Sequence, residues 1–66
     1  MTITINGQRH EVSTDASLAE AMRVFGAPER GVAVAVDGTV VPRARWADTV
    51  LHEEATVEVL TAVQGG

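Results

Sequence analysis

The sequence predicts an α+β fold in which a mixed sheet of four to five strands packs one face against a single main helix. Three observations lead to this prediction. Short runs alternate apolar with polar residues, one segment has the apolar spacing of a helix, and two dipeptides are typical of tight hairpin turns, Asn6-Gly7 and Asp37-Gly38. At 66 residues the chain has the length of one small domain, which buries only about 60% of the surface exposed on unfolding.

The first hairpin is expected at the N-terminus. Residues 1–6 alternate, with Ile3 and Ile5 on one face and threonines on the other, and Asn6-Gly7 indicates a two-residue type I′ turn. Residues 8–12 are expected to return as a second strand. Because most of them are polar, this strand is expected at an edge of the sheet.

A capping box predicts where the helix begins. Ser17 and Glu20 have the spacing at which the hydroxyl and the carboxylate satisfy each other's backbone N–H groups. The apolar positions i, i+3, i+4 and i+7 that follow are Leu18, Ala21, Met22 and Phe25. They form one stripe to bury. Gly26 stands where a left-handed C-cap is expected, and Pro28 prevents the helix from continuing.

Two further strands are expected after the helix. Residues 32–36 alternate Val with Ala, so both faces are apolar and the strand is expected inside the sheet. Asp37-Gly38 predicts a second tight turn into a short strand over residues 39–41. Pro42 ends that strand because proline has no amide N–H to donate to a neighbour.

The last strand is predicted over residues 56–63, with Val57 and Val59 on one face. An irregular or one-turn segment over residues 43–48 and a charged turn at Glu53-Glu54 precede it. This order of elements is the β-grasp arrangement of ubiquitin-like domains. We expect residues 1–63 to form the β-grasp domain and residues 64–66 to form a flexible C-terminal tail.

The composition excludes several classes of function. Nine acidic residues against five arginines give a net charge of −4, which disfavours binding to nucleic acid and to anionic lipid. Without cysteine, no side chain can supply a disulfide or a thiolate, and without lysine the protein cannot form isopeptide-linked chains on itself. No signal-peptide pattern is present and no apolar run approaches about 20 residues. We therefore expect a cytoplasmic monomer that binds no metal.

The closing residues are the most informative about function. Gly65 and Gly66 carry no side chain, so the α-carboxylate of Gly66 is sterically the most accessible reactive group. Residues 64–66 reach about 10 Å beyond the last strand, enough to enter the active site of a partner. A carboxylate is a poor electrophile until an activating enzyme adenylates it with ATP, and this sequence has no glycine-rich phosphate loop of its own. Gln64, Gly65, Leu60 and Ala62 are the predicted partner-binding residues. The alternative is a glycine terminus without a role.

Other residues that could carry chemistry have simpler interpretations. Trp46 either anchors a partner or covers the small core, and we favour the core. His10 and His52 have no second ligand at metal-binding spacing and are expected at the surface or in turns. Glu53 and Glu54 are expected to form a solvated turn rather than an acid–base pair. Together with the other acidic residues of the C-terminal half, Asp48 and Glu58, they are expected to steer a basic partner.

Five segments carry a resemblance to a known family. They are Ala16-Ser17-Leu18-Ala19-Glu20, Val34-Ala35-Val36, Val40-Val41-Pro42-Arg43, Trp46, and the ending Thr61-Ala62-Val63-Gln64-Gly65-Gly66. Over essentially its whole length the chain resembles the ThiS family, the sulfur carriers of thiamine biosynthesis. One departure is Glu53-Glu54-Ala55, where the family often has an Asp-Gly-Asp turn.

The resemblance implies a function for the tail. An adenylating enzyme of the ThiF or MoeB type would activate Gly66, and sulfur from a donor protein would convert it to a thiocarboxylate for thiazole synthase. The chain would be a carrier and protein co-substrate, not an enzyme, and ATP would be used by the activating enzyme. Three alternatives remain from the sequence: a carrier like the small subunit of molybdopterin synthase, a modifier attached through Gly66 to lysines of other proteins, and a plain interaction domain with inert glycines.

Overall fold

A computed structural model describes residues 1–28 and 30–61 of the chain. Its elements, in chain order, are β1 (Thr2–Ile5), β2 (Gln8–Glu11), α1 (Leu18–Phe25), β3 (Val32–Val36), β4 (Thr39–Val40), the 3-10 helix η1 (Arg43–Asp48) and β5 (Thr56–Thr61). The predicted elements are confirmed, and the segment expected to be irregular or one-turn is a six-residue 3-10 helix. The predicted end of the last strand at residues 62 and 63 lies outside the described residues.

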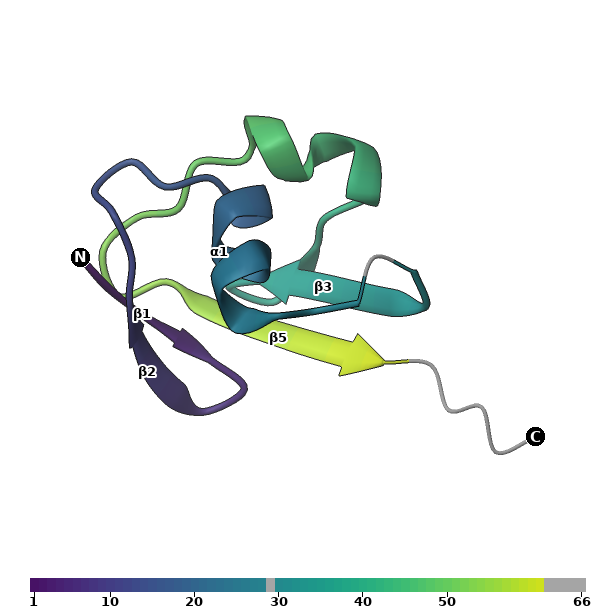
Figure 1. Cartoon of the computed structure of the whole chain (residues 1–66), viewed down its shortest axis with the longest axis horizontal. Coiled ribbons are helices and arrows are strands. Elements are labelled where there is room, and N and C mark those ends of the chain that lie inside the picture. Colours follow the sequence, from purple (N-terminus) through teal and green to yellow (C-terminus); the bar gives the residue numbers. More distant parts are fainter. Residues whose placement is uncertain (29, 62–66) are drawn as a thin grey trace.

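The strands form one mixed sheet in the order β2-β1-β5-β3-β4. β1 pairs with β5 in parallel, and the other pairings are antiparallel. α1 lies across one face of this sheet, and η1 lies on the same side (Figure 1). The α+β prediction is therefore confirmed, with β2 at an edge as expected and β5 at the centre.

The two predicted tight turns are present. Asn6 and Gly7 have φ values of 50° and 83°, and Asp37 and Gly38 have φ values of 51° and 87°. Positive φ at both central residues defines the type I′ geometry, whose twist matches that of the flanking strands. These turns fix the register of the β1–β2 and β3–β4 hairpins.

Both ends of α1 are capped as predicted. Glu20 N–H donates to the Ser17 hydroxyl at 3.1 Å, and Ser17 N–H donates to the Glu20 carboxylate at 3.0 Å. At the other end, Gly26 adopts φ 86° and donates its N–H to the Met22 carbonyl at 2.9 Å. The intervening helix is only eight residues long, so its stability depends on burial of the apolar stripe.

The core fills the space between α1, η1 and the covered face of the sheet. Its buried residues are Ile3, Ile5, Leu18, Ala21, Met22, Val34, Trp46, Leu51, Ala55, Val57 and Val59. Trp46 is 6% exposed and donates its indole N–H to the Val41 carbonyl at 2.9 Å. The prediction that Trp46 covers the core is confirmed.

Two expectations need correction. β3 is an internal strand, but Ala33 on its second face is exposed because only one layer covers the sheet. His10 is half-buried rather than at the surface. It pairs with Ile3 across the hairpin, on the covered side of the sheet, and meets Phe25 edge to face at a centroid distance of 6.0 Å. No described residue offers its Nε2 a hydrogen-bond partner.

Within the two described ranges, no helix combines the length and the apolar character needed to cross a membrane.

Candidate functional site

The predicted site begins at the end of β5, in the centre of the sheet. β5 has β1 on one side and β3 on the other, and Thr61 is its last described residue. Ala62, Gln64, Gly65 and Gly66 lie outside the described residues. Of the predicted site residues, the structure therefore places only Leu60, together with the sheet that leads to the tail.

Leu60 lies on the face of the sheet that α1 does not cover. Along β5, Val57 and Val59 are buried in the core, and Leu60 between them and the tail is 70% exposed. The neighbouring strand places Ala33 opposite Leu60, and Val40 on β4, 67% exposed, is opposite Ala35. We call the surface of Leu60, Ala33, Ala35 and Val40 the open face. Such a group of apolar side chains on one exposed face is typical of an interaction site.

A groove lies beside Leu60, next to the open face. It has a volume of about 390 Å³ and lies over the β1–β5 pair. Its lining includes Thr4, Thr56, Glu58 and Leu60.

Asn6 connects the first hairpin to β5. Its side-chain Nδ2 donates to the Val59 carbonyl at 3.1 Å, and Val59 N–H donates to Asn6 Oδ1 at 2.8 Å. These two bonds continue the β1–β5 pairing beyond Ile5, next to Leu60. Sequence reasoning recognised Asn6 only as a turn residue, because nothing in the spacing indicates a partner 53 positions away.

We expect Asn6→Gly to destabilise the protein by about 1–3 kcal/mol, because two polar backbone groups of Val59 lose their partners. Glycine retains the positive φ of the turn, so the side-chain amide is the group tested. Urea unfolding followed by Trp46 fluorescence measures the loss. Asn6→Asp tests the donor alone, since it keeps an acceptor for Val59 N–H but sets a carboxylate oxygen against the Val59 carbonyl oxygen, and it should also be destabilising. Wild-type stability of Asn6→Asp would contradict the role of the amide.

A second connection joins the β3–β4 turn to the segment before β5. The Asp37 carboxylate accepts Thr56 N–H at 3.0 Å and His52 Nε2–H at 2.5 Å. His52 Nδ1 lies 2.8 Å from the Glu53 carbonyl. Both ring nitrogens therefore face acceptors, an arrangement that only the doubly protonated ring satisfies. His52 is exposed, as predicted, but its pairing with Asp37 was not foreseen.

These contacts shift both titrations. The hydrogen bond to Asp37 raises the pKa of His52 above its ordinary value, with a further contribution from the Glu53 carbonyl. The hydrogen bond from His52 lowers the pKa of Asp37 below its ordinary value, with a further contribution from Thr56 N–H. The stability that protonated His52 contributes is fully present at pH values below its unfolded-state pKa of 6.5. It is lost as pH rises through the raised pKa of the folded state. The stability that ionised Asp37 contributes is fully present at pH values above its ordinary pKa of 3.8. It is lost as pH falls through the lowered pKa of the folded state.

We therefore expect the contribution of this pair to be largest between the two ordinary values and to fall toward alkaline pH. The measurement is the free energy of unfolding at about pH 5.5 and about pH 8.5, because His52 is expected to lose its charge between these two values. From the lower to the higher pH, the wild type should lose more of its free energy of unfolding than Asp37→Asn does. Asparagine tolerates the positive φ and still accepts Thr56 N–H. The same pH dependence in both proteins would contradict the pairing.

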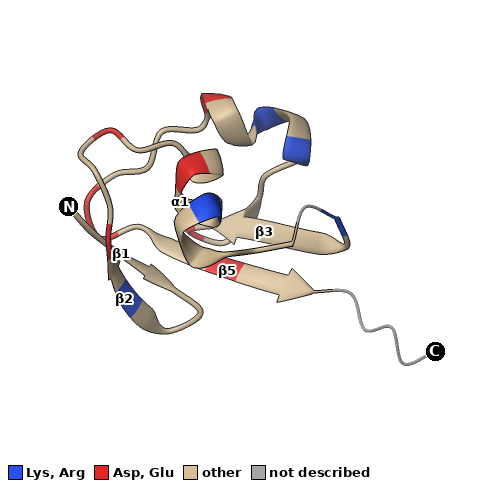
Figure 2. Ribbon diagram, in the orientation of Figure 1, with Lys and Arg blue, Asp and Glu red and all other residues tan. Residues whose placement is uncertain are grey.

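The acidic side chains of the C-terminal half are solvated. Glu54 lies 3.5 Å from Arg9, whereas Glu53 accepts Thr2 N–H at 3.0 Å. Since the adjacent glutamates contact different partners, the prediction of a charged turn rather than an acid–base pair is confirmed. Figure 2 shows acidic segments around the loops near the N-terminus and on β5, whereas α1 and η1 each carry both acidic and basic segments. Steering of a basic partner by the acidic residues stays a prediction.

Over residues 1–28 and 30–61, no three His, Asp or Glu side chains are placed to hold a metal ion. What the described arrangement offers is an apolar open face, a groove beside Leu60 and a central strand that leads toward Gly66.

A five-stranded mixed sheet with one helix packed on one face defines a ubiquitin-like β-grasp domain. Two solved structures share it over the whole of this chain. A crystal structure of the thiamine biosynthesis protein ThiS from Geobacter metallireducens superposes with a TM-score of 0.83 at 25% identity and is itself fully covered. A solution structure of a thiamine biosynthesis protein from the same organism gives a TM-score of 0.76 at 26% identity, with 88% of that chain covered.

The family model of the ThiS family matches residues 3–66. The chain belongs to the ThiS family. A comparison with curated proteins gives no match. The resemblance noted from the sequence is therefore confirmed, and the match includes the region of the Gly65-Gly66 ending.

Proposed function

We propose that this protein is a sulfur carrier for thiazole formation in thiamine biosynthesis, and that it serves as a protein co-substrate rather than as a catalyst. Membership of the ThiS family is the observation that supports this most strongly. The apolar open face around Leu60 supports it independently, because a carrier has to dock on the enzymes that use it.

In the proposed reaction the Gly66 carboxylate attacks the α-phosphorus of ATP on an adenylating enzyme of the ThiF or MoeB type. An acyl-adenylate forms and pyrophosphate leaves. A persulfide on the donor protein then attacks the carbonyl carbon and AMP leaves, giving an acyl disulfide. A thiol cleaves the S–S bond, releasing the thiocarboxylate and ending as a disulfide with the donor cysteine. The thiocarboxylate delivers its sulfur to thiazole synthase.

The side chains of this protein take no part in these steps. It contains no cysteine, so in this proposal the sulfur travels on the main-chain terminus of Gly66. Residues 1–63 act as the domain that partners recognise, and residues 64–66 act as the tail that enters their active sites. The two glycines matter because any Cβ would restrict the backbone in a narrow channel.

The test is the mass of the intact chain after incubation with ATP, a ThiF- or MoeB-type enzyme and a persulfide donor. Replacement of one oxygen by sulfur should add about 16 Da, and fragmentation should place the gain on Gly66. Omission of ATP is the control and should leave the mass unchanged. If the complete mixture also leaves the mass unchanged while a ThiS protein of known competence gains sulfur, the proposal fails.

Docking through the open face makes a separate prediction. We expect Leu60→Glu to slow adenylation of Gly66 by at least about tenfold, because a charge buried in an apolar contact costs a few kcal/mol unless it is paired. Pyrophosphate release measures the rate. Val24→Glu is the matched control, since Val24 is 64% exposed but lies on α1, away from the open face. Equal slowing in both variants would contradict docking at Leu60.

A further inference from the structure

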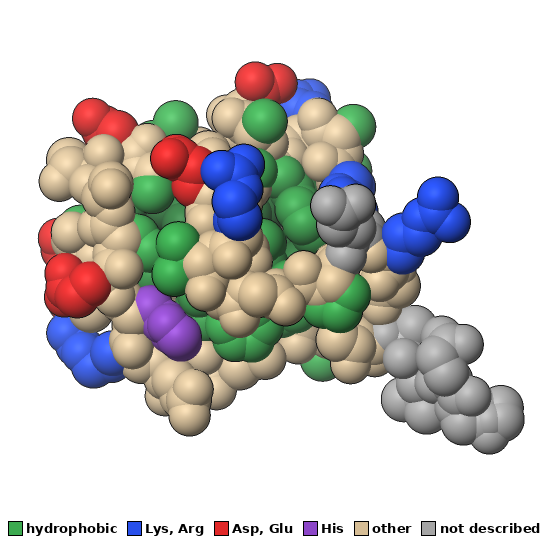
Figure 3. Space-filling model, viewed as in Figure 1, with side chains coloured by type: hydrophobic (Ala, Val, Ile, Leu, Met, Phe, Trp, Pro, Cys, Tyr) green, Lys and Arg blue, Asp and Glu red, His purple; other side chains and the backbone are tan. Residues whose placement is uncertain are grey.

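A hollow between α1 and η1 lies on the helix side of the molecule, away from the open face. It has a volume of about 350 Å³, close to the lower end of the range of about 300–1,000 Å³ for ligand sites. Met22, Pro28 and Trp46 supply apolar surface to its lining, and Arg23 and Arg43 supply positive charge. None of its described lining residues is acidic. Figure 3 shows apolar side chains recessed next to an arginine on this face.

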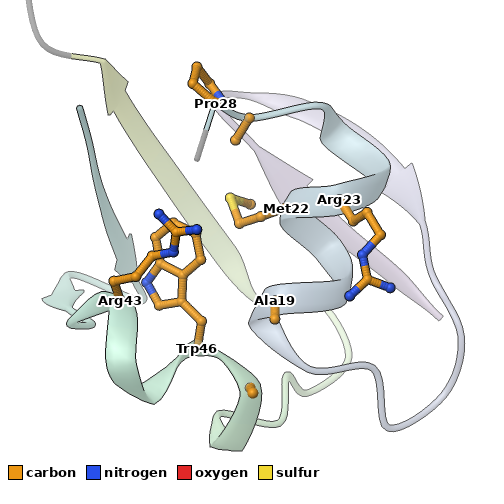
Figure 4. A pocket seen from close by; sticks show the side chains of 8 residues that line it. Ala19, Met22, Arg23, Pro28, Arg43 and Trp46 are labelled. Atoms are coloured by element: carbon orange, nitrogen blue, oxygen red, sulfur yellow. The ribbon is translucent and has the colours of Figure 1, made fainter. Parts of the chain in front are cut away.

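Arg43 is held in place before any partner arrives. Its guanidinium carbon lies 5.1 Å from the centroid of the Trp46 ring, and the hydrogen bond to the Val41 carbonyl fixes that ring. Figure 4 shows Arg43 lying over Trp46, with Met22 directed from α1 toward the same space. Stacking occupies the face of the guanidinium and leaves its edge N–H groups able to donate. A carboxylate therefore meets a pre-oriented donor beside apolar walls.

The charge of this hollow is opposite to that of the whole protein. The chain has a net charge of −4, yet the hollow combines Arg43 with Arg23, which follows Met22 on α1. A ligand that complements both properties carries negative charge next to an apolar group. A free phosphate would leave the apolar walls uncovered, and a nucleic acid would meet the repulsion of the acidic remainder of the surface.

We propose that this hollow binds an acidic segment of a partner protein. A carboxylate of that segment pairs with Arg43, a second one lies near Arg23, and an adjacent apolar side chain packs on Pro28 and on the edges of Met22 and Trp46 that line the hollow. Arginine and aromatic residues are enriched at protein interfaces for these reasons. The hollow and the open face lie on opposite sides of the sheet and have no residue in common. The proposal does not depend on sulfur transfer.

The probe is the peptide acetyl-Asp-Leu-Asp-Phe-Asp-amide, titrated into the isotope-labelled full chain and followed by amide and indole N–H chemical shifts. We expect saturable shifts with a dissociation constant of about 1 mM or tighter, centred on α1, η1 and the Trp46 indole N–H. The asparagine counterpart, acetyl-Asn-Leu-Asn-Phe-Asn-amide, should bind at least about tenfold more weakly, since it lacks the charged half of each arginine pair. Absence of saturable shifts, equal binding of both peptides, or shifts centred on the open face would overturn the proposal.

Two variants and a control locate the charges. Arg43→Gln should weaken binding by about tenfold, because stacking on Trp46 orients the Arg43 guanidinium before the peptide binds. Arg23→Gln should weaken it by about threefold, because an exposed ion pair contributes less. Arg23→Gln leaves the stacking on Trp46 intact, so its effect does not depend on the fold of η1. The control is Arg9→Gln, an exposed arginine on β2 with the same change in charge. Equal weakening by the control, or displacement of the peptide by an equal concentration of inorganic phosphate, would overturn the proposal.

Discussion

Deletion of Gly66 is expected to abolish sulfur loading and, in a host that depends on this protein, growth without added thiamine. The deletion withdraws the reacting carbonyl by about 3.3 Å, and a misplacement of about 1 Å already costs about a hundredfold in rate. The expected loss is therefore at least about a hundredfold. It is measured as the rate of AMP release in the loading reaction and as growth of the complemented strain.

The control for this deletion is Val24→Ala, which changes an exposed side chain on α1 and should support normal loading and growth. Gly66→Ala separates chain length from steric access, because it restores the length and adds one Cβ. We expect it to load sulfur more slowly than the wild type and faster than the deletion. Growth of the deletion strain at the wild-type rate would show that Gly66 is dispensable and that the proposed function is wrong.

Leu18→Ala is expected to remove about half or more of the free energy of unfolding. Leu18 is fully buried at the start of α1, and truncation of such a side chain costs about 2–5 kcal/mol. A domain below about 70 residues rarely has more than about 3–5 kcal/mol of stability from its core. The measurement is urea unfolding followed by Trp46 fluorescence, with Val24→Ala on the same helix as the control, expected within about 0.5 kcal/mol of wild type. A loss below about 1 kcal/mol for Leu18→Ala would contradict the packing described for α1.

Local chemistry explains how much of the fold was predictable. The capping box of Ser17 and Glu20 and the two type I′ turns each require particular residues at fixed spacing, so the sequence alone predicts where α1 begins and where both hairpins reverse. The alternation along β5 predicts correctly that Val57 and Val59 are buried and that Leu60 is exposed. These features depend on neighbours within a few residues.

The features that were missed depend on residues that are distant in the sequence. The side chain of Asn6 bonds the backbone of Val59, and His52 bonds Asp37, because the sheet order places β1 and the β3–β4 turn next to β5. His10 is partly buried because its ring packs edge to face against Phe25 of α1. Composition and spacing carry no signal for such pairs, and the same holds for the hollow between α1 and η1.

From the sequence alone, single residues of the site could be predicted, but not the surface that they form together. Leu60 was correctly placed on the uncovered face, whereas Ala33, Ala35 and Val40, which complete the open face, were not recognised. Alanine and valine on β3 suggest a strand buried on both sides. The sequence does not show that one of those faces lacks a covering layer.

The intact mass of this protein isolated from its native host, under conditions of active thiamine synthesis, tests the central claim most directly. The account predicts a population about 16 Da heavier than the unmodified chain, with the gain assigned to Gly66. An alkylating reagent that reacts with the thiocarboxylate sulfur should shift this population by a further, defined mass. A chain found only with an unmodified Gly66 carboxylate, while thiazole is being made, would contradict the claim that this residue carries the sulfur.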